Sequence, residues 1–510
     1  MATYTFETLI NGATMPGIVA AKVIADAGYG VLIIEWTRFA GGMVPSLGLP
    51  DYVGNTNYGL TTKFFQDIEA AAIADGATEA TYGRHPNGLI RRYAPNWALT
   101  ARNAMLATPG ITLIKDIEIA GVVKDPTTKE VTSVTLTNGD TYVIGRKQGA
   151  DLSYEGDLLR HAGIPMRYGR ESKGAFNEYC AGVHVADGQT NPGQRRISLR
   201  GDVWKFYNQV PQDIRVGTGD FKTQAFNFRM TLSTETNRRV FQPPPGYRVE
   251  DFADWIDETN VRNMSTIENI TSYQSITSTL HTTNGNDWPG HAWVYPRLRT
   301  KAERLKFIDQ MYYRHAGQYY ASMIDPRVPQ AMRTSVAAHG LPATHNTDEY
   351  IGQPGWSSAH YVRICNRMVG QQTMTFQDVT SPYRQAKTDP VAIGGYNVDR
   401  HSVNYYPVNN GAGWVNEGHP ENEGRGYYQI PFKSLKPNLN NCTNLLSGVC
   451  ISMSDIVACS VRMEPTWMVI GQAVGLAIVA AIQNNVPVAR LPYAALKERL
   501  VSAGAVITYA

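Results

Sequence analysis

A histidine among hydrogen-bonding side chains is the first candidate for chemistry in this sequence. Tyr396, Asn397, Asp399 and His401 stand close together along the chain. A histidine in such a cluster can act as a general base that takes a proton from a substrate hydroxyl. The same side chains can instead form a hydrogen-bonded structural cluster without a reactive role. The sequence leaves both interpretations of His401 open.

The elements that would position a ligand begin at residues 4–35, which predict a strand, a helix and a second strand. Residues 6–10 form a short extended run, residues 17–27 have helical composition, and residues 31–34 are continuously apolar. Glu35 follows at the spacing at which an acidic residue reaches the ribose hydroxyls of a bound dinucleotide. This order predicts the βαβ unit of a dinucleotide site.

The turn within this unit departs from the usual glycine pattern. Its sequence is GATMPG, with Gly12 first, Gly17 third, and Thr14 where the second glycine belongs. The second glycine normally lets the backbone approach the pyrophosphate, so the side chain of Thr14 crowds that approach. Pro16 removes an N–H group from the same loop. The unit is either a dinucleotide site or the same fold with a decayed nucleotide site.

A second feature that could face a ligand is a predicted core helix at residues 465–482. Gly471 and Gly475 lie on one of its faces, where they let another backbone approach closely. Arg462, Met463 and Glu464 precede the helix. Its N-terminus offers unpaired N–H groups and the positive end of the helix dipole, which favour an anionic ligand.

Other stretches predict the remaining elements. Residues 111–144 read as a small antiparallel meander with an Asn138–Gly139 hairpin, and residues 221–247 alternate like strands. The polar stretch at residues 145–149 predicts a locally altered or exposed sheet edge, because a central parallel strand is apolar on both faces. Residues 301–324 predict an amphipathic helix.

Residues 281–297 mix aromatic side chains with amides and a carboxylate, which include Trp288, Trp293, Tyr295 and Asp287. Aromatic rings beside such groups suit the binding of sugar rings. A packed aromatic loop without a ligand explains the same residues equally well.

Composition limits the possible partners. Only 18% of the 510 residues are charged, the net charge is +3, and Lys and Arg form no cluster. We therefore expect no nucleic-acid partner. The N-terminus lacks the pattern of a signal peptide, and the longest apolar run, at residues 467–482, is shorter than a membrane span. We expect a soluble protein with no membrane partner, and its compartment stays unknown.

The cysteines and histidines predict neither disulfides nor a metal site. Five cysteines are an odd number in a large chain, so we expect free thiols. Histidine pairs such as His339 and His345 lack the helical spacing of metal ligands. We therefore expect no metal.

Longer segments resemble FAD-dependent oxidoreductases of the Rossmann-type, two-domain flavoprotein superfamily. The resemblance covers residues 9–506 and is greatest to a bacterial branch often found beside polysaccharide-degrading enzymes. It rests on NLLSGVCISMSDIVACSVRMEPTWMVIGQAVG near the C-terminus and on GGYNVDRHSVNYY around His401. It also rests on DLSYEGD, in which the matching residues are Asp151, Ser153, Tyr154, Glu155, Gly156 and Asp157.

The resemblance implies an α/β fold and an FAD cofactor. Residues 1–165 and 427–510 would form a Rossmann-type FAD-binding domain built from both chain ends, and residues 166–426 an inserted α+β substrate or cap domain. His401 would take a substrate proton in a chamber over the flavin while hydride leaves to the flavin. The implied FAD-binding residues are Gly12, Thr14, Gly17, Glu35, Arg38, Gly41, Gly42, Met43, Ile119, Ser153, Glu155, Gly156, Asp157, Arg462 and Met463.

One departure from the family falls on a second catalytic candidate, Asp455. Relatives commonly read Cys-x-Ser-x-Ser-His, whereas this chain ends the same pattern with Asp455. An aspartate reverses the charge preference of a neutral imidazole beside a flavin. We expect Asp455 to fold back toward the N–H groups in front of Pro465, where it would repel a reduced flavin. The space there would then hold protein side chains or solvent rather than FAD.

Two functions follow from these patterns. One is an FAD-dependent oxidoreductase that moves hydride from a hydroxyl or amine carbon of a small molecule, for example a carbohydrate, to the flavin. The other is a cofactor-free derivative of the fold that serves as a structural or binding component of a larger assembly, such as a virion or another extracellular particle. With this second function, the chain would act as a homo-oligomer or with an assembly partner. The departures at Thr14, Pro16, residues 145–149 and Asp455 favour it, since all fall on the flavin side.

Overall fold

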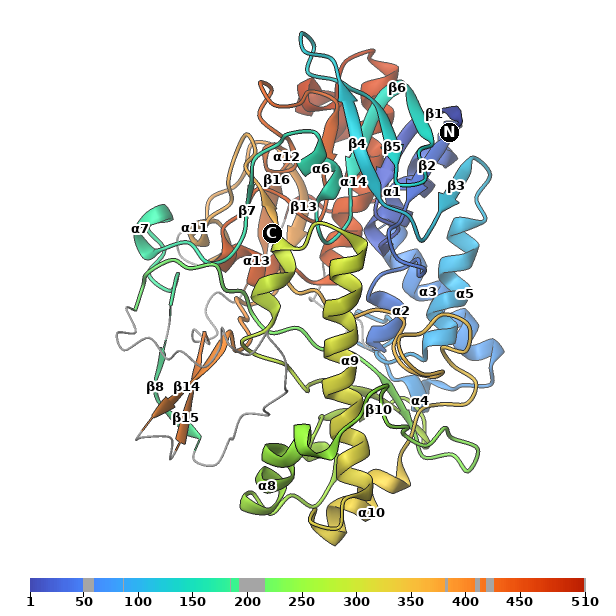
Figure 1. Cartoon of the computed structure of the whole chain (residues 1–510). Helices are drawn as coiled ribbons and strands as arrows, with labels where there is room; N and C mark the ends of the chain where they lie inside the picture. The colour runs from blue at the N-terminus through green and yellow to red at the C-terminus, as the bar shows by residue number, and fades with distance from the viewer. Residues whose placement is uncertain are drawn as a thin grey trace.

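A seven-stranded sheet, in the upper part of the view in Figure 1, joins the two ends of the chain. The computed structural model describes residues 1–48, 59–85, 87–183, 185–191, 216–380, 384–408, 413–418 and 426–508. The strand order is β3-β2-β1-β6-β5-β4, and β17 pairs with β6. The strands are β1 Thr3–Asn11, β2 Val31–Ile34, β3 Ile111–Ile114, β4 Ile119–Lys124, β5 Val131–Leu136, β6 Thr141–Asp151 and β17 Leu445–Ser447.

The predicted βαβ unit and the predicted core helix are both confirmed, and they pack on each other. Helix α1, Met15–Asp26, connects the parallel strands β1 and β2. It lies against α14, Glu464–Gln483. A Cβ atom on Gly471 would lie 2.3 Å from the carbonyl oxygen of Pro16, and one on Gly475 would lie 2.7 Å from that of Ala20. The two glycines therefore allow the helix backbones to approach closely.

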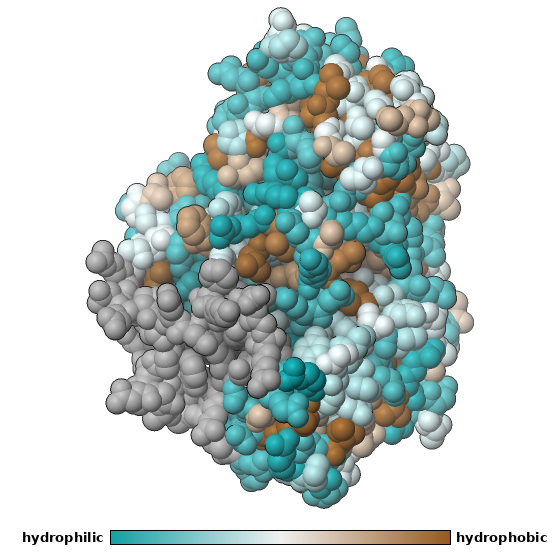
Figure 2. Space-filling view, in the orientation of Figure 1, coloured by the Kyte–Doolittle hydropathy of each residue, from teal (hydrophilic) through white to brown (hydrophobic). Residues whose placement is uncertain are grey.

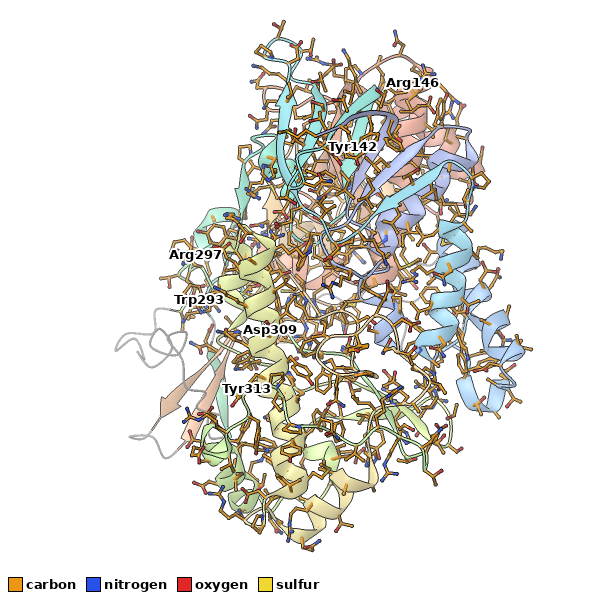
Figure 3. The ribbon with its side chains drawn as sticks, turned by 45° about the vertical axis from the view of Figure 1, so that its right-hand side comes forward. Tyr142, Arg146, Trp293, Arg297, Asp309 and Tyr313 are labelled. Carbon is orange, nitrogen blue, oxygen red and sulfur yellow. The ribbon has the colours of Figure 1, made fainter. Side chains whose placement is uncertain are left out.

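The meander is smaller than predicted. Strand β3 pairs in parallel with β2, so it extends the Rossmann-type part of the sheet, and only β4, β5 and the first half of β6 are antiparallel. The polar stretch at residues 145–149 lies within β6, where the pairing with β1 shifts register and Lys147 has a positive φ of 51°. Arg146 pairs there with Glu7 at 3.2 Å, and its side chain lies at the surface of the molecule (Figure 3). The sheet is thus locally altered, as expected.

The middle of the chain forms the second layer of the molecule, around the long helix α9, Lys301–Ile324 (Figure 1). Thr300 caps this helix by accepting the N–H of Glu303. The strands predicted at residues 221–247 are mostly wrong, because within them only β9, Thr231–Ser233, is a strand. Trp288 and Tyr295 are 4% and 1% exposed, so they belong to the core and are not free for sugar. Trp293 lies beside α9, and the guanidinium carbon of Arg297 is 5.7 Å from the centre of its ring (Figure 3).

The other elements complete the architecture. The short strands are β7 Met166–Arg167, β8 Val185–Asn191, β10 Tyr273–Ser275, β11 Leu280–Thr283, β12 Arg367–Met368, β13 Pro390–Gly394, β14 Asn404–Val408, β15 Gly413–Glu417 and β16 Tyr428–Pro431. The other α-helices are α2 Val44–Leu47, α3 Gly59–Ala74, α4 Glu79–Tyr82, α5 Pro95–Leu106, α6 Asp157–His161, α7 Lys173–Phe176, α8 Ala253–Val261, α10 Gln330–Ala338, α11 Phe376–Val379, α12 Phe432–Leu435, α13 Asp455–Val461 and α15 Tyr493–Ser502. The 3₁₀ helices are Val249–Phe252, Ile267–Asn269, Ala292–Arg297 and Val488–Arg490. The domain boundaries at residues 165 and 427 stay a prediction.

Helix α14 is the most apolar long helix of the described chain. The sequence indicated an apolar run too short to span a membrane, but the helix is long and apolar enough to cross one. However, 89% of its most apolar window is buried inside the protein. It is therefore the core helix of a globular protein. On the face shown in Figure 2, hydrophobic residues lie in small groups separated by hydrophilic ones.

The cysteines have the free thiols that the sequence predicts, and the described residues also bear on the metal prediction. The cysteines are free and buried, at Cys180, Cys365, Cys442, Cys450 and Cys459. Within the described residues, no group of three or more His, Cys, Asp or Glu side chains is arranged to hold a metal ion.

Candidate functional site

The turn that would face a pyrophosphate is packed against the protein's own backbone. Gly12 has a φ of +95°, and a Cβ atom there would lie 2.4 Å from the backbone nitrogen of Ser153. Thr14 caps α1, and its hydroxyl donates to the carbonyl oxygen of Leu152 at 2.6 Å. A Cβ atom on Gly17 would lie 2.0 Å from the carbonyl oxygen of Gly12. These residues come together as predicted, but each has an internal structural reason for its type.

Glu35 lies beside this turn and is held by it. One carboxylate oxygen accepts the Ala13 N–H at 2.8 Å, and the other accepts the N–H and the hydroxyl of Thr37 at 2.9 and 2.8 Å. The side chain is buried, and burial raises the pKa of Glu35 to about 7 although these hydrogen bonds lower it. The Ala13 N–H, which a phosphate-binding loop would offer to its ligand, is therefore already used.

We predict that Glu35→Gln lowers the free energy of unfolding by about 1–2 kcal/mol without any nucleotide, because an amide cannot accept from all three donors. The folded-state pKa is raised, so the contribution of Glu35 to stability falls as the pH rises from about 4.5 toward 7. The loss should be larger at pH 5 than at pH 8. Urea denaturation at both pH values measures it. An unchanged stability at both would leave the ribose role as the better explanation of Glu35.

The glycine-rich segment after Glu35 also contacts the protein itself. Gly41 donates its N–H to the carbonyl oxygen of Ala13 at 2.6 Å. Gly42 has a φ of +59°, and a Cβ atom there would lie 2.4 Å from the hydroxyl oxygen of Tyr154. Arg38 points away, is exposed, and pairs with Asp116 at 3.4 Å. The segment therefore surrounds a tyrosine side chain.

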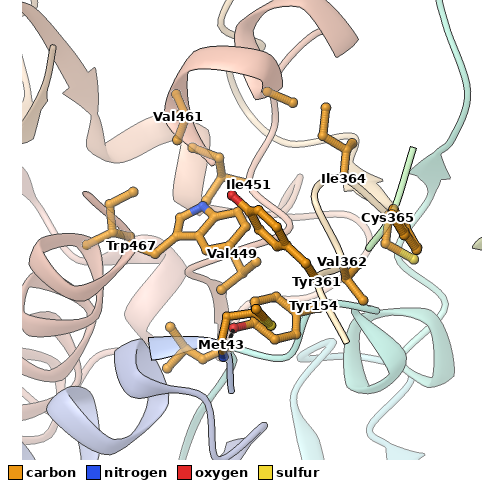
Figure 4. Close-up of a cluster of buried hydrophobic side chains, with 14 of the residues drawn as sticks. Met43, Tyr154, Tyr361, Val362, Ile364, Cys365, Val449, Ile451, Val461 and Trp467 are labelled. Atoms are coloured by element: carbon orange, nitrogen blue, oxygen red, sulfur yellow. Dashed lines mark hydrogen bonds between the residues drawn. The ribbon is translucent and has the colours of Figure 1, made fainter. Parts of the chain in front are cut away.

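Tyr154 joins the two elements that the resemblance assigns to the flavin (Figure 4). Its hydroxyl accepts the N–H of Met43 at 3.0 Å and donates to the carboxylate of Glu464 at 2.6 Å. Glu464 is in the first turn of α14, after the N-cap residue Met463. The centre of the Tyr154 ring lies 5.6 Å from the centre of the Trp467 ring. The phenol thus fills the space between the glycine-rich segment and the N-terminus of α14.

The space left beside Tyr154 is a cavity of about 10 Å³. Its lining includes Tyr154, Arg363, Asn366, Arg462 and Trp467. A volume of this size corresponds to about one water molecule. With Tyr154 in this position, the three-ring isoalloxazine of FAD does not fit at this cavity.

The DLSYEGD segment binds to itself and to distant side chains. The Ser153 hydroxyl donates to Asp151 at 2.7 Å and accepts the N–H of Gly156 at 3.0 Å. Glu155 accepts the hydroxyl of Tyr295 at 2.7 Å. Asp157 is bound by Arg304, with N–O distances of 2.5 and 2.8 Å. The residues assigned to FAD therefore have protein partners.

Ile119 is the residue whose backbone was expected to meet the adenine ring. It begins β4, where its side chain is buried opposite Leu136. Its backbone contact with an adenine ring stays a prediction.

His401 lies between two carboxylates. Its Nδ1 is 2.6 Å from Asp287 and its Nε2 is 3.4 Å from Asp399. Burial would raise the pKa of Asp287, but Arg363 and His401 outweigh it and hold that pKa well below its usual range. Both ring nitrogens thus face carboxylate oxygens of the protein. In this arrangement the ring is engaged within the cluster, which fits its structural interpretation.

Arg462 completes this polar cluster. It donates to Asp399 at 2.9 Å and to the hydroxyl of Tyr361 at 2.9 Å. Tyr396 donates to Asp399 at 3.3 Å. Arg462 therefore holds the His401 cluster against α14 and also lines the small cavity.

The prediction that Asp455 folds back toward α14 is wrong. Asp455 is the first residue of α13, and its carboxylate accepts from Arg400 at 2.9 Å and lies 3.9 Å from Arg367. Both arginines are 1% exposed, so their charges require a nearby anion. Burial raises the pKa of Asp455, while Arg400 and Arg367 act against the rise. The change from histidine to aspartate is thus matched by arginines from other segments.

The carboxylate at the N-terminus of α14 is Glu464 instead. The sequence places Glu464 at this N-terminus, and an acidic residue in the first turn of a helix is stabilised there. Trp36, Tyr295 and Arg304, which contact the predicted FAD residues, give no such signal, because their roles depend on contacts between distant segments.

Comparisons with known proteins give partial structural similarities and one family match. Solved structures similar to part of this chain include L-proline dehydrogenase from P. horikoshii, with 14% identity, a TM-score of 0.25, and coverage of 33% of this chain and 59% of that one. Another is NikD, an unusual amino acid oxidase, with 18% identity, a TM-score of 0.21, and coverage of 33% and 57%. The match thus spans less than two thirds of these relatives' own lengths. No curated protein sequence matches. A family model described as FAD dependent oxidoreductase matches residues 7–500, so the chain belongs to the FAD-dependent oxidoreductase family.

Proposed function

We propose that this family member uses its fold without flavin, as a binding or structural component of a larger assembly. The observation that carries the proposal is the position of Tyr154, whose hydroxyl bridges Met43 and Glu464, two residues in the segments that the family resemblance assigns to the flavin. The use of the Ala13 N–H by Glu35 supports it, because a phosphate would need that donor. The partner in the assembly is a second copy of this chain or another protein.

The absorption spectrum of the purified protein and a titration with FAD test this proposal. We expect no flavin bands, no saturable change in flavin fluorescence, and no increase in Tm. A ligand at 100 times its Kd would stabilise the folded state by about 2.7 kcal/mol, which a melting curve detects. Flavin at close to one equivalent per chain, or a Tm that rises with FAD concentration, would overturn the proposal.

Flavin-dependent oxidation is the second candidate, and the family match over residues 7–500 favours it. Its substrate would be a small molecule with an oxidisable hydroxyl or amine carbon, for example a carbohydrate. Tyr154 would have to leave its bridge, and His401 would have to turn from Asp287 before it could accept a proton. In this candidate, Glu35→Gln weakens FAD binding, whereas in the first there is no FAD binding to weaken.

A further inference from the structure

The DLSYEGD segment is held by side chains from the part of the chain around α9. Arg304, in the first turns of α9, binds Asp157 through two N–O contacts of 2.5 and 2.8 Å. Tyr295, shortly before α9, donates its hydroxyl to Glu155 at 2.7 Å. Arg304 and Tyr295 are each 1% exposed. These contacts are therefore shielded from water, where charged hydrogen bonds are strong.

Trp36 connects this group to the first dinucleotide motif. It directly follows Glu35, and its side chain is near Glu155: burial raises the pKa of Glu155, and Trp36 acts against that rise. The guanidinium carbon of Arg304 lies 5.3 Å from the centre of the Trp36 ring. A dinucleotide that runs from Glu35 to Asp157 would have to pass the stacked Trp36 and Arg304 side chains.

We propose that Trp36, Glu155, Asp157, Tyr295 and Arg304 form an interdomain lock, in which side chains of the chain itself occupy the dinucleotide path and fasten α9 to the sheet. The inference rests on the proposed function, because a bound dinucleotide would need the same space. It assigns Arg304 as a positioning residue that takes the place of a ligand. The lock makes the sheet and the α9 region one cooperative unit without any cofactor.

A double-mutant cycle tests the lock in the full chain without nucleotide. Arg304→Met leaves the buried charge of Asp157 short of its main partner, and Asp157→Asn leaves Arg304 without its carboxylate. We expect each variant to lower Tm by about 5 °C or more, and the double variant to lower it by clearly less than the sum. Arg304→Lys keeps the charge and one contact, so it gives a milder cycle with Asp157→Asn if Arg304→Met does not fold. Additive shifts would overturn the lock.

The exposed pair Lys22 and Asp26 on α1 provides the matched control. Its side chains are 25% and 48% exposed, so the cycle of Lys22→Met and Asp26→Asn should show no measurable coupling. Hydrogen exchange separates a lock from a local ion pair. In Arg304→Lys, residues 151–161 and 301–324 should exchange faster together, and α5 should not change. Faster exchange in the first turn of α9 alone would overturn the lock.

The two proposals can fail separately. The cycle is measured without nucleotide, so additive shifts remove the lock whatever the FAD titration gives. FAD binding by the wild-type protein removes the proposed function and the claim that these side chains occupy the dinucleotide path, while a measured coupling between Arg304 and Asp157 would still stand as a contact that fastens α9 to the sheet.

Discussion

Restoring the histidine that relatives carry, by Asp455→His, is expected to lower the free energy of unfolding by about 3–5 kcal/mol. Arg400 and Arg367 are almost completely buried around the Asp455 carboxylate. Removal of one partner from a buried charge cluster costs this much, because Arg400 then stays away from water without its carboxylate, whereas Arg367 keeps Glu171 at 2.8 Å. The aspartate also stands at the first position of α13, where a negative charge stabilises the helix and an imidazolium does not.

Urea denaturation at pH 7 measures this effect. Asp455→Asn keeps the shape of the side chain without its charge and should show an intermediate loss. Asp26→His, at a side chain that is 48% exposed, should change stability by less than about 0.5 kcal/mol. A stable Asp455→His protein would mean that the arginines do not depend on Asp455.

Tyr154→Phe is expected to lower the free energy of unfolding by about 2–4 kcal/mol. The substitution keeps the ring against Trp467 but removes the hydroxyl that Met43 and Glu464 both use. A hydrogen bond to a charged group contributes about 1.5–3 kcal/mol, and a neutral one about 0.5–1.5 kcal/mol. Because the ring stays in place, the variant should still not bind FAD.

The same denaturation experiment on Tyr4→Phe provides the control. Tyr4 is 45% exposed, so its substitution should change stability by less than about 0.5 kcal/mol. Glu464→Gln removes the charge at the other end of the bridge and should lose less than Tyr154→Phe, since the amide oxygen still accepts the hydroxyl proton. If Tyr154→Phe is as stable as the wild type, the bridge does not hold the site closed.

The elements with strong local signals were predictable from the sequence. Residues 301–324 are the helix that their amphipathic pattern predicts, because the apolar stripe and the Thr300 cap act within the segment itself. The βαβ unit and α14 follow from continuous apolar runs and from glycine spacing in the same way. The strands predicted at residues 221–247 failed, since alternation alone does not provide a partner strand.

In the candidate site, too, the residues in local motifs were predictable and their contacts with distant segments were not. The sequence identified Gly12, Gly17, Gly41 and Gly42, and the structure shows that close backbone or side-chain contacts require a small residue at each of them. It could not show that the contact at Gly42 is Tyr154, because that contact joins residues more than 100 positions apart.

By itself, the sequence determined the βαβ unit and the core helix, which depend on local periodicity, and its resemblance to the FAD-dependent oxidoreductases, which depends on contiguous motifs. The expectation of an α/β fold built from both chain ends came with that resemblance. Only the tertiary structure decided which groups meet at the site. Arg400 faces Asp455, Arg304 faces Asp157, and Tyr154 faces Glu464. Each pair joins distant segments, and the charge or hydrogen-bonding capacity of one residue is stable in the interior only because the fold brings its partner to it.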